Sequence, residues 1–356
     1  MSTELPEEKP YPGETCPAPF FSHEKVLLAH GGGGKLTHQL IDAVFQPAFK
    51  NTQLETQHDG AVIDFPATKL VMTTDSYVVN PLVFPGGDIG SLAVNGTIND
   101  LAMCGARPRY LTVGFILEEG LPIATLQTVV HSMKLAAQKN GVCIVTGDTK
   151  VVAKGNGDGI YINTAGVGEA HPVLRVHPDR IRPGDSILLS SDLARHGIAV
   201  LSAREGLEFQ TPILSDCASV FPTVQNLLDS GIQVHCLRDL TRGGLATALI
   251  EIANTSNLTF KIEESAVVIQ EPVRGACELL GFDPFYIANE GCFVAFVSPD
   301  DAQRTLEIMQ QYQGEGKASI IGTVEQTNEN GVILKTTVGS SRALDMLSGD
   351  QLPRIC

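Results

Sequence analysis

The pattern of apolar and polar positions over residues 69–167 predicts strands and helices in alternation. A short apolar run before Asp75 has the composition of a strand. Asp88 can cap the first turn of a helix in which Ile89, Leu92 and Ala93 recur at helical spacing. These segments make up one domain of mixed helix and sheet. The predicted elements are strands at 69–74, 142–146 and 161–167, a helix from 88 that ends before 105, and a helix from 125 to a glycine cap at 141.

The second half of the chain repeats this mixture after a change in composition. Proline and charged residues gather between His171 and Asp185, and a new apolar run begins at Ser186, so we place a domain boundary at 172/173. The predicted fold class is α+β with mixed α/β character, in two domains. The predicted segments are a Pro-rich leader at 1–23, an N-terminal domain at 24–172, a C-terminal domain at 173–340 and a mobile tail at 341–356. Within the C-terminal domain we predict strands at 186–190, 287–297, 319–325 and 331–337, and helices at 219–230, 243–254, 272–281 and 301–312.

Composition and charge exclude several classes of protein. The 356 residues carry a formal net charge of −15, which argues against binding to nucleic acid or to an anionic membrane. No apolar run reaches the roughly 18 residues that a membrane-spanning helix needs. Residues 1–22 are rich in proline and acidic side chains, without the basic start and apolar core of a signal peptide. We therefore expect a disordered leader and a cytoplasmic protein.

The eight cysteines show no Cys-x-x-Cys pair and no zinc-finger spacing. In a cytosolic chain most of them are expected to be reduced, and a structural zinc ion is not expected. Four have apolar neighbours and are predicted to be small core residues, namely Cys104, Cys143, Cys277 and Cys292.

A run of four glycines at 31–34 stands between His30 and Lys35. Successive glycines let backbone N–H groups approach an anion, and Lys35 adds positive charge. The segment is not a Walker A loop, because Ala29 and Leu36 occupy its required Gly and Ser/Thr positions. A phosphate clamp and a flexible connector both remain open.

Carboxylates give a more specific signal, because several follow or interrupt apolar stretches. Asn95, Asn99 and Asp100 are polar residues within an otherwise apolar helix. Burying a polar group without a partner costs about a few kcal/mol of folding free energy. We expect these side chains to meet a ligand, an ion or water. Mg²⁺ prefers one or two carboxylates together with phosphate oxygens of a substrate, so dispersed aspartates indicate a magnesium–nucleotide site. Turn or helix-cap roles are the alternative for any one of the five, Asp59, Asp75, Asp100, Asp148 and Asp239.

Two residues are candidates for proton transfer. Lys150 closely follows Asp148, and Glu290 lies at the edge of a predicted strand. A carboxylate beside a lysine can shift the pKa values of both groups, as a general base near neutral pH requires. Surface ion pairing is the alternative interpretation.

The last residue, Cys356, is a thiol that has no chain beyond it to pack against. An extended chain spans about 3.3 to 3.6 Å per residue, so a mobile stretch from 347 to 356 carries the sulfur about 30 Å. Pro353 stiffens the approach, and the Arg354 cation offsets the terminal carboxylate that disfavours a thiolate. This position predicts a thiol that carries a chemical group, with a frayed terminus as the alternative.

Seven motifs follow one another along nearly the whole chain after residue 23. They are His30-Gly-Gly-Gly-Gly-Lys35, Asp75-Ser-Tyr-Val-Val-x-Pro81, the segment from Asn95 to Pro108, Gly147-Asp-Thr-Lys-Val-Val152, Arg238-Asp-Leu-Thr-Arg-Gly-Gly244, Asn289-Glu-Gly291 and Pro353-Arg-Ile-Cys356. Together these motifs resemble the HypE family of hydrogenase-maturation proteins. That family shares a superfamily with aminoimidazole ribonucleotide synthetase, selenophosphate synthetase and thiamine-monophosphate kinase.

The resemblance implies an aminoimidazole ribonucleotide synthetase-like fold of two domains. Its N-terminal sheet would pair with that of a second subunit in a homodimer, and ATP would bind in the dimer cleft. By resemblance to selenophosphate synthetase, Mg²⁺ would bind to Asp59, Asp100 and Asp239, and Lys35 would bind the nucleotide. The further residues expected at the nucleotide are Asp75, Asn99, Asp148, Thr149, Thr241 and Asn289.

The resemblance also implies a reaction at the terminal thiol. A partner of the HypF type would load a carbamoyl group onto Cys356, and this protein would then use ATP to dehydrate it to a thiocyanate. Lys150 and Glu290 are the candidates for deprotonating the nitrogen. The cyano group would pass to iron on a HypC–HypD complex and become a ligand of the nickel–iron hydrogenase centre. The alternatives are a small-molecule synthetase or kinase of the same superfamily, and a scaffold that holds metal through Cys356.

Overall fold

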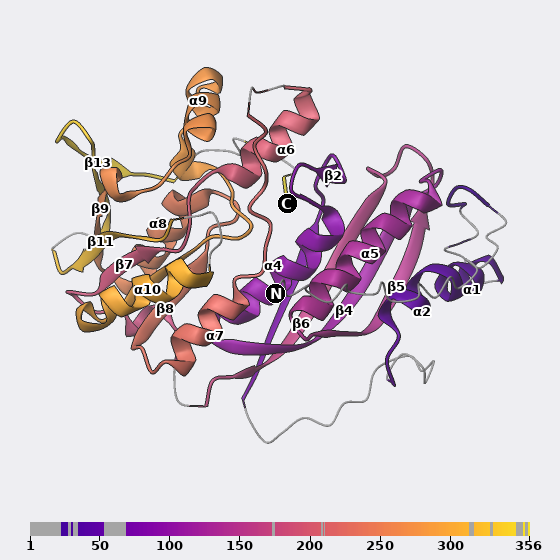
Figure 1. Ribbon diagram of the computed structural model, residues 1–356, viewed down its shortest axis with the longest axis horizontal. Coiled ribbons are helices and arrows are strands. Elements are labelled where there is room, and N and C mark those ends of the chain that lie inside the picture. Colours follow the sequence, from indigo (N-terminus) through magenta and orange to yellow (C-terminus); the bar gives the residue numbers. More distant parts are fainter. Residues whose placement is uncertain are drawn as a thin grey trace, which may run out of the picture.

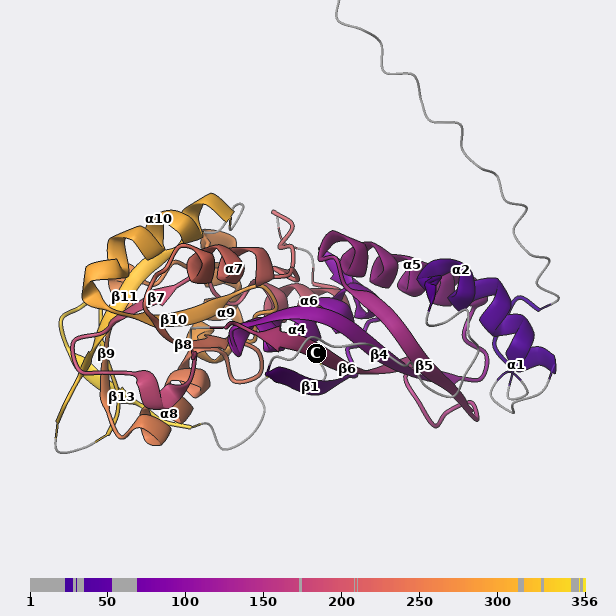
Figure 2. The same ribbon diagram turned by 90° about the horizontal axis from the view of Figure 1, so that it is seen from below.

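Two lobes, each containing its own main sheet, make up the computed structural model (Figures 1 and 2). One cluster of buried apolar side chains runs through both lobes, from Val26 to Ile355. The structure describes residues 23–27, 30, 35–52, 69–172, 175–207, 209, 211–312, 317–327, 330–346, 352 and 355–356.

A four-stranded sheet with the strand order β1-β6-β4-β5 forms the N-terminal lobe. Strand β4 pairs parallel with β5 and antiparallel with β6, which pairs antiparallel with β1. Helices α4 and α5 cover one face of this sheet (Figure 2), whereas the other face presents exposed Leu70, Met72 and Ile116. The bounds are β1 Leu70–Tyr77, β4 Ala106–Glu118, β5 Cys143–Val152, β6 Ile160–Ala170, α4 Ile89–Met103 and α5 Ile123–Lys139, with a small hairpin of β2 Val83–Phe84 and β3 Gly87–Asp88.

A seven-stranded sheet with the order β13-β12-β9-β11-β7-β10-β8 forms the C-terminal lobe. All neighbours are antiparallel except β12 and β9. Helix α8 lies on one side of this sheet, and α7 and α10 lie on the other (Figure 2). The bounds are β7 Ser186–Leu189, β8 Val234–Asp239, β9 Thr259–Glu263, β10 Phe293–Val297, β11 Ser319–Glu325, β12 Gly331–Lys335, β13 Ser341–Leu344, α7 Phe221–Asp229, α8 Gly244–Ser256 and α10 Ala302–Tyr312.

Shorter helices complete the chain. The N-terminal lobe adds a run of α1, a π-helix and α2, and the C-terminal lobe adds α6 and α9. Their bounds are α1 Lys35–Leu40, the π-helix Ile41–Phe45, α2 Gln46–Phe49, α6 Arg195–Glu205 and α9 Glu271–Leu280, with 3₁₀ turns at Pro178–Arg180, Glu264–Ala266, Pro284–Tyr286 and Pro299–Asp301.

Helix α4 lies where the two lobes meet, because it contacts β1 and β6 as well as α7 and β8. It begins as the sequence predicts. The Asp88 carboxylate accepts hydrogen bonds from the N–H groups of Gly90 and Ser91 at 2.7 and 2.9 Å. Nearly every residue of α4 is buried, as expected for a helix with neighbours on all sides. This position carries Asp100, near the end of α4, into the junction between the lobes.

Several elements differ from the prediction, and helix α6 and strands β8 and β9 are among those that were not predicted. Strand β4 was not predicted, because Pro108 interrupts its pattern; a register shift against β6 between Pro108 and Tyr110 accommodates this proline within the strand. The predicted strand at 287–297 is shorter, since residues 287–292 form a loop and β10 begins at Phe293. Residues 341–344, predicted as the start of the tail, pair with β12 as strand β13.

Candidate active site

A polar pocket of about 200 Å³ forms between the lobes, and the terminal Cys356 is one of the residues that line it. Strand β1 and helix α4 supply one wall. The loops that follow β8 and precede β10 supply the opposite wall. The lining residues are Thr74, Asp75, Ser76, Asp100, Thr241, Arg242, Glu290 and Cys356. The pocket therefore joins parts of five sequence motifs that are far apart along the chain.

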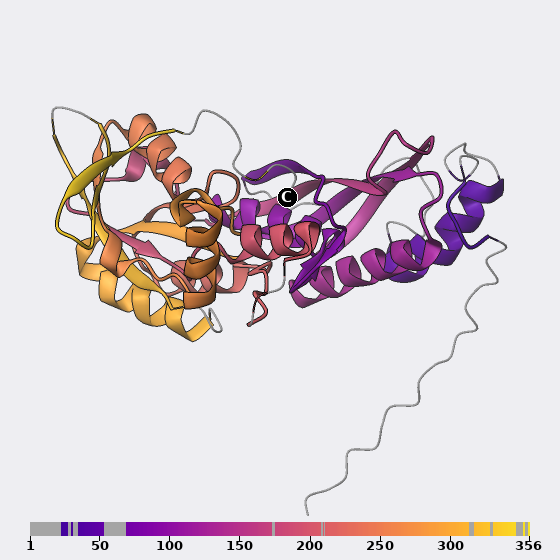
Figure 3. The same cartoon turned by 90° about the horizontal axis from the view of Figure 1, so that it is seen from above.

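The chain terminus reaches this pocket because the last described residues of the tail, beyond strand β13, lie between the lobes (Figures 1 and 3). Ile355 is buried and Cys356 is half-buried. The N–H of Val78 donates to the backbone carboxylate of Cys356 at 3.4 Å. The sequence predicts a mobile tail, whereas these last residues are packed against the core. Pro353 and Arg354 lie outside the described residues.

Two carboxylates of the predicted metal set lie close enough to repel each other. Burial raises the pKa of Asp100 to about 6, and repulsion from Asp75 adds to this shift. Burial raises the pKa of Asp239 to about 7, with repulsion from Asp100 as the next cause. Thr73 Oγ1 donates to Asp100 Oδ2 at 2.8 Å. Such a crowded pair suits a divalent cation, because the cation favours the ionised form of both groups.

The third predicted metal ligand, Asp59, lies outside the described residues, as do glycines 31–34. Lys35 begins α1, but its side chain is likewise not described. Within the described ranges, no three His, Cys, Asp or Glu side chains are grouped closely enough to enclose a metal ion. Asp100 and Asp239 are thus the described part of the predicted site.

Glu290 is a buried acid that lines the same pocket as Cys356. Burial raises its pKa well above the ordinary value, and repulsion from Asp216 adds to the effect. Its Oε1 atom has no hydrogen-bond partner in the described part of the structure. Asp216 anchors the loop, since its carboxylate accepts from the N–H groups of Glu290 and Gly291 at 3.1 Å each. Glu290 is therefore held in place by its backbone while its side chain stays available for a ligand.

Two asparagines predicted at the nucleotide make hydrogen bonds to the protein backbone. Asn289 is fully buried; its Oδ1 accepts from Ala194 N–H at 2.7 Å, and its Nδ2 donates to two backbone carbonyls at 3.0 Å. Asn99 donates to the Ala218 carbonyl at 3.0 Å and accepts from Val220 N–H at 2.8 Å. Both amides join chain segments to one another. Asn99 thus bonds to protein backbone, and its contact with the nucleotide stays a prediction.

A second group of predicted residues lies on β5, away from the pocket that holds Cys356. Lys150 pairs with the Asp148 carboxylate at 2.8 Å, and both side chains are exposed. The surface ion pair expected as the alternative interpretation is therefore present. The Lys150 ammonium and the backbone N–H of Thr149 hold the pKa of Asp148 below its ordinary value.

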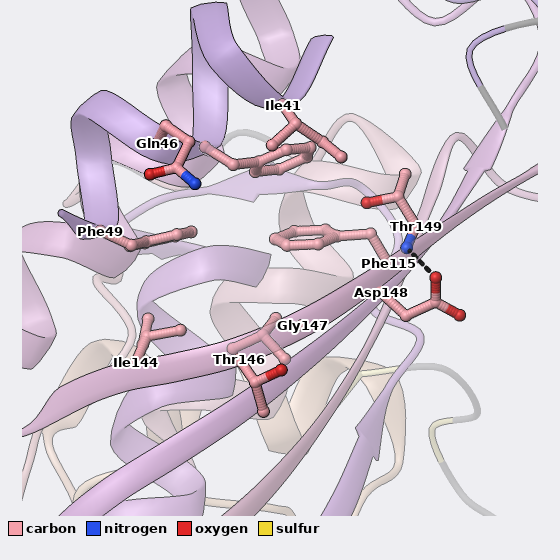
Figure 4. A pocket seen from close by; sticks show the side chains of 11 residues that line it. Ile41, Gln46, Phe49, Phe115, Ile144, Thr146, Gly147, Asp148 and Thr149 are labelled. Carbon is pink, nitrogen blue, oxygen red and sulfur yellow. Dashed lines mark hydrogen bonds between the residues drawn. The ribbon is translucent and has the colours of Figure 1, made fainter. Parts of the chain in front are cut away.

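Beside Asp148 and Thr149 lies an apolar pocket of about 150 Å³ (Figure 4). The rings of Phe49 and Phe115 project into it from α2 and from the sheet, and Thr146 and Gly147 of β5 form its edge (Figure 4). Phe45 packs against Phe115 with ring centroids 4.9 Å apart. Flat aromatic walls next to polar backbone suit a planar heterocycle.

Several pocket residues were not identified from the sequence. Thr74, Ser76 and Arg242 stand within or beside quoted motifs, so their motifs carried a signal for them. His196 and Ser215, which contact the tail or support that contact, stand in segments without any motif. No local pattern around either residue marks its role.

The expectation of four core cysteines holds for Cys277 and Cys292, which are buried. It is wrong for Cys104 and Cys143, which are exposed. Cys104 follows the last turn of α4 and Cys143 begins the edge strand β5. Both residues therefore lie at the end of an element, where fewer neighbouring side chains cover them. Among the helices that the structure describes, none has the length and apolar character needed to cross a bilayer.

Comparison with known proteins gives two family matches. Residues 57–170 match the N-terminal domain, and residues 182–335 the C-terminal domain, of AIR synthase related proteins. The chain is 50% identical over 331 residues to the carbamoyl dehydratase HypE of Azotobacter vinelandii, covering 93% of this chain and 97% of that protein. It is 43% identical over 336 residues to carbamoyl dehydratase HypE of Escherichia coli K12, covering 93% and 99%.

Solved structures of HypE proteins are similar to this chain as well. A crystal structure of the hydrogenase maturation protein HypE in complex with ATP matches with a TM-score of 0.89 and 46% identity, covering 93% of this chain and 99% of that one. A HypE–HypF complex matches with a TM-score of 0.76 and 43% identity, covering 88% of this chain and 100% of that one. A thiamine-monophosphate kinase from Stenotrophomonas maltophilia, 18% identical with a TM-score of 0.64 over 85% and 96% of the two chains, shares the fold.

Proposed function

Because the chain belongs to the HypE family of AIR synthase related proteins, we propose that it dehydrates an S-carbamoyl group on its own Cys356 with ATP. It is a carbamoyl dehydratase of hydrogenase maturation, and it binds ATP. The observation that carries the proposal is the position of Cys356, which lines one pocket together with Asp100 and Glu290. The product is a Cys356 thiocyanate, which supplies the cyanide ligand of a nickel–iron hydrogenase centre.

The proposed chemistry divides the loss of water into two steps. The carbamoyl oxygen attacks the γ-phosphorus of ATP, ADP leaves, and one N–H proton is lost, which leaves a phosphorylated imidate on sulfur. The second N–H proton and the phosphate then leave, and a carbon–nitrogen triple bond forms. Phosphorylation is needed because an amide oxygen is a poor leaving group. The sum is S-carbamoyl-Cys356 plus ATP giving S-cyano-Cys356, ADP and phosphate.

The pocket residues divide this work by their chemistry. Glu290 is the proposed base for the nitrogen, because a raised pKa makes its carboxylate a better proton acceptor near neutral pH. Arg242 and Thr241 line the same pocket and supply donors for phosphate oxygens. Asp100 and Asp239, with Asp59, would hold Mg²⁺. That ion would neutralise charge on the transferring phosphoryl group.

The apolar pocket beside Asp148 and Thr149 is the proposed seat of the adenine ring, with Lys35 near the phosphates. Phe49 and Phe115 offer the aromatic surfaces for stacking (Figure 4). If so, Phe49→Ala should raise the ATP concentration needed for half-maximal dehydration about tenfold, since base stacking contributes roughly 1 to 3 kcal/mol. An unchanged ATP requirement would place the ring elsewhere.

A homodimer would unite the two groups of site residues. Strands β1 and β5 are opposite edges of the four-stranded sheet, so three strand spacings of about 4.8 Å separate the strand that carries Asp75 from the strand that carries Lys150. The open face with Leu70, Met72 and Ile116 is the proposed contact with a second copy, whose Lys150 and nucleotide-binding residues would then face this pocket. Lys150 acts as a second candidate base only in that arrangement.

This dimer predicts a specific effect of charge on the open face. Met72, 71% exposed, is expected to be covered in the dimer, so Met72→Asp should give a monomer by light scattering. Leu279→Asp is the matched control, because Leu279 is 79% exposed on α9 of the other lobe and should leave the dimer intact. A wild-type chain of monomer mass, or equal behaviour of both variants, would reject this interface.

The partners follow from the reaction. A HypE–HypF complex is known for the family, and HypF is the proposed donor of the carbamoyl group. A HypC–HypD complex that holds iron is the proposed acceptor of the cyano group. Both exchanges require the tail to leave the pocket.

Mass spectrometry of Cys356 tests the proposed function. The protein is incubated with carbamoyl phosphate, HypF, ATP and Mg²⁺, and the C-terminal peptide is weighed. When the ATP site of this protein is inactivated, we expect Cys356 to keep its carbamoyl adduct. In the active wild type, we expect the adduct to become lighter by the mass of one water. A carbamoyl adduct that never loses water would contradict the dehydratase function.

A further inference from the structure

The tail is held by a histidine that no motif marks. His196 is fully buried in the first turn of α6, and its Nε2 lies 2.5 Å from the backbone carbonyl of Ile355. We propose that His196 is a positioning residue whose Nε2–H seats the tail and thereby holds the Cys356 thiol in the active-site pocket. This inference rests on the proposed function, since it concerns how the carbamoylated thiol is presented for dehydration.

The hydrogen bonds around His196 are consistent with only one arrangement of protons. The Ile355 carbonyl can only accept, so Nε2 carries the proton. Burial lowers the pKa of His196, so the ring is neutral and Nδ1 is an acceptor. Ser215 Oγ lies 2.8 Å from Nδ1 and must donate to it. Cys217 N–H in turn donates to Ser215 Oγ at 3.0 Å. The serine thus selects the tautomer that can bind the tail.

Hydrogen bonds and a ring contact hold the rest of the seat around His196 in place. Ser215 is fixed by its own N–H, which donates to the Pro85 carbonyl at 2.8 Å. The Phe84 ring stands edge-on to His196, with centroids 5.4 Å apart. Helix α6 is anchored at its start by the hydrogen bond between Ala194 and Asn289 described above. A rigid donor places a carbonyl more exactly than a mobile one, because no further ordering is needed when the tail arrives.

The next residue of α6 favours the docked tail by shape. A Cβ atom at Gly197 would lie 2.5 Å from Ile287 Cγ2 and 3.1 Å from Leu352 Cδ1, so the glycine leaves room both for the loop before β10 and for this tail residue. Leu352 and Ile355 are both buried. His196 contacts the tail backbone one residue before the thiol. Its bond therefore fixes the distance between the helix and Cys356, whichever group the sulfur carries.

Alkylation of Cys356 measures the docked population directly and needs no partner protein. The full-length protein is treated with iodoacetamide, and the rate at Cys356 is compared by mass spectrometry with the rates at Cys104 and Cys143, which are exposed. His196→Phe keeps a ring but removes the donor, and we expect Cys356 to react about tenfold faster. His196→Gln retains an N–H at a similar reach and should react nearly as wild type.

A matched control separates seating from general loss of stability. His235 is also buried and bonded, with its Nδ1 2.7 Å from an Asp185 carboxylate oxygen. His235→Asn should leave the Cys356 rate unchanged. Should His196→Phe fail to fold, Ser215→Ala removes the hydroxyl that selects the tautomer and should raise the rate a few-fold. Unchanged alkylation in the folded His196 or Ser215 variant, or an equal rise in the His235 variant, overturns the proposal.

Turnover supplies a second readout. With pre-carbamoylated protein, His196→Phe should lower the rate of dehydration at saturating ATP about tenfold while the KM for ATP stays the same. A rise in the KM for ATP with an unchanged maximal rate would contradict a role in seating. If the wild type itself never loses water, the proposed function fails, whereas the alkylation rates still decide whether His196 seats the tail.

Discussion

Replacing Cys356 with alanine should abolish thiocyanate formation completely, because the variant has no sulfur to accept a carbamoyl group. The rest of the site should survive. Cys356 lies at the end of the chain and contributes only one of the eight residues that line the pocket. ATP binding, followed by calorimetry, should stay within about twofold of the wild type, since no contact beyond the tail is removed. ATP turnover that depends on carbamoyl phosphate and HypF should fall to background.

The control is Cys143→Ala, which removes an exposed thiol on β5 and should leave dehydration unchanged. The same pair of variants separates the dehydratase from a small-molecule kinase or synthetase of the superfamily. Full ATP turnover by the Cys356 variant with a free metabolite would favour that rival. Equal loss in both variants would point to general damage rather than to the terminal thiol.

Replacing Asp100 with asparagine should lower ATP-dependent dehydration about a hundredfold or more, because the variant loses an anionic ligand for Mg²⁺ next to the transferring phosphoryl group. Carbamoylation of Cys356 by HypF should remain, since the tail and its thiol are unchanged. The measurement is again the mass of the C-terminal peptide, which should stop at the carbamoyl adduct. Loss of carbamoylation as well, in a folded variant, would contradict the assignment.

The same substitution should stabilise the protein when Mg²⁺ is absent. The pKa of Asp100 is about 6 in the fold against 3.8 for an ordinary aspartate, so the folded state binds the proton more tightly. The contribution of this proton binding to the stability of the folded state is present below about pH 4 and is lost as the pH rises through 6. The asparagine side chain carries no charge, so Asp100→Asn should gain up to about 3 kcal/mol at pH 8 and little at pH 4. Asp179→Asn, at an exposed site, should show no such gain.

Much of the fold and of the candidate site could be predicted from short segments of the sequence. The helix that begins at Asp88 follows from a capping carboxylate and apolar spacing, both of which act within a few residues. The motifs around Asp100, Asp239 and Glu290 mark residues that the structure gathers at one pocket or beside it. By contrast, β4 breaks the local rule for strands at Pro108, and the pairing that overrides this rule comes from β6 and β5.

The sequence by itself determined the chemical parts of this protein: the terminal thiol, the carboxylates, and most of the helices that carry them. These depend on residue type and on hydrogen bonds between near neighbours. Only the tertiary structure decided how the parts are used. It turned Asn289 and Asn99 toward backbone, separated Lys150 from Cys356, and brought His196 to the Ile355 carbonyl. Each of these outcomes depends on contacts between residues many positions apart, and no local pattern encodes the distance at which such groups meet.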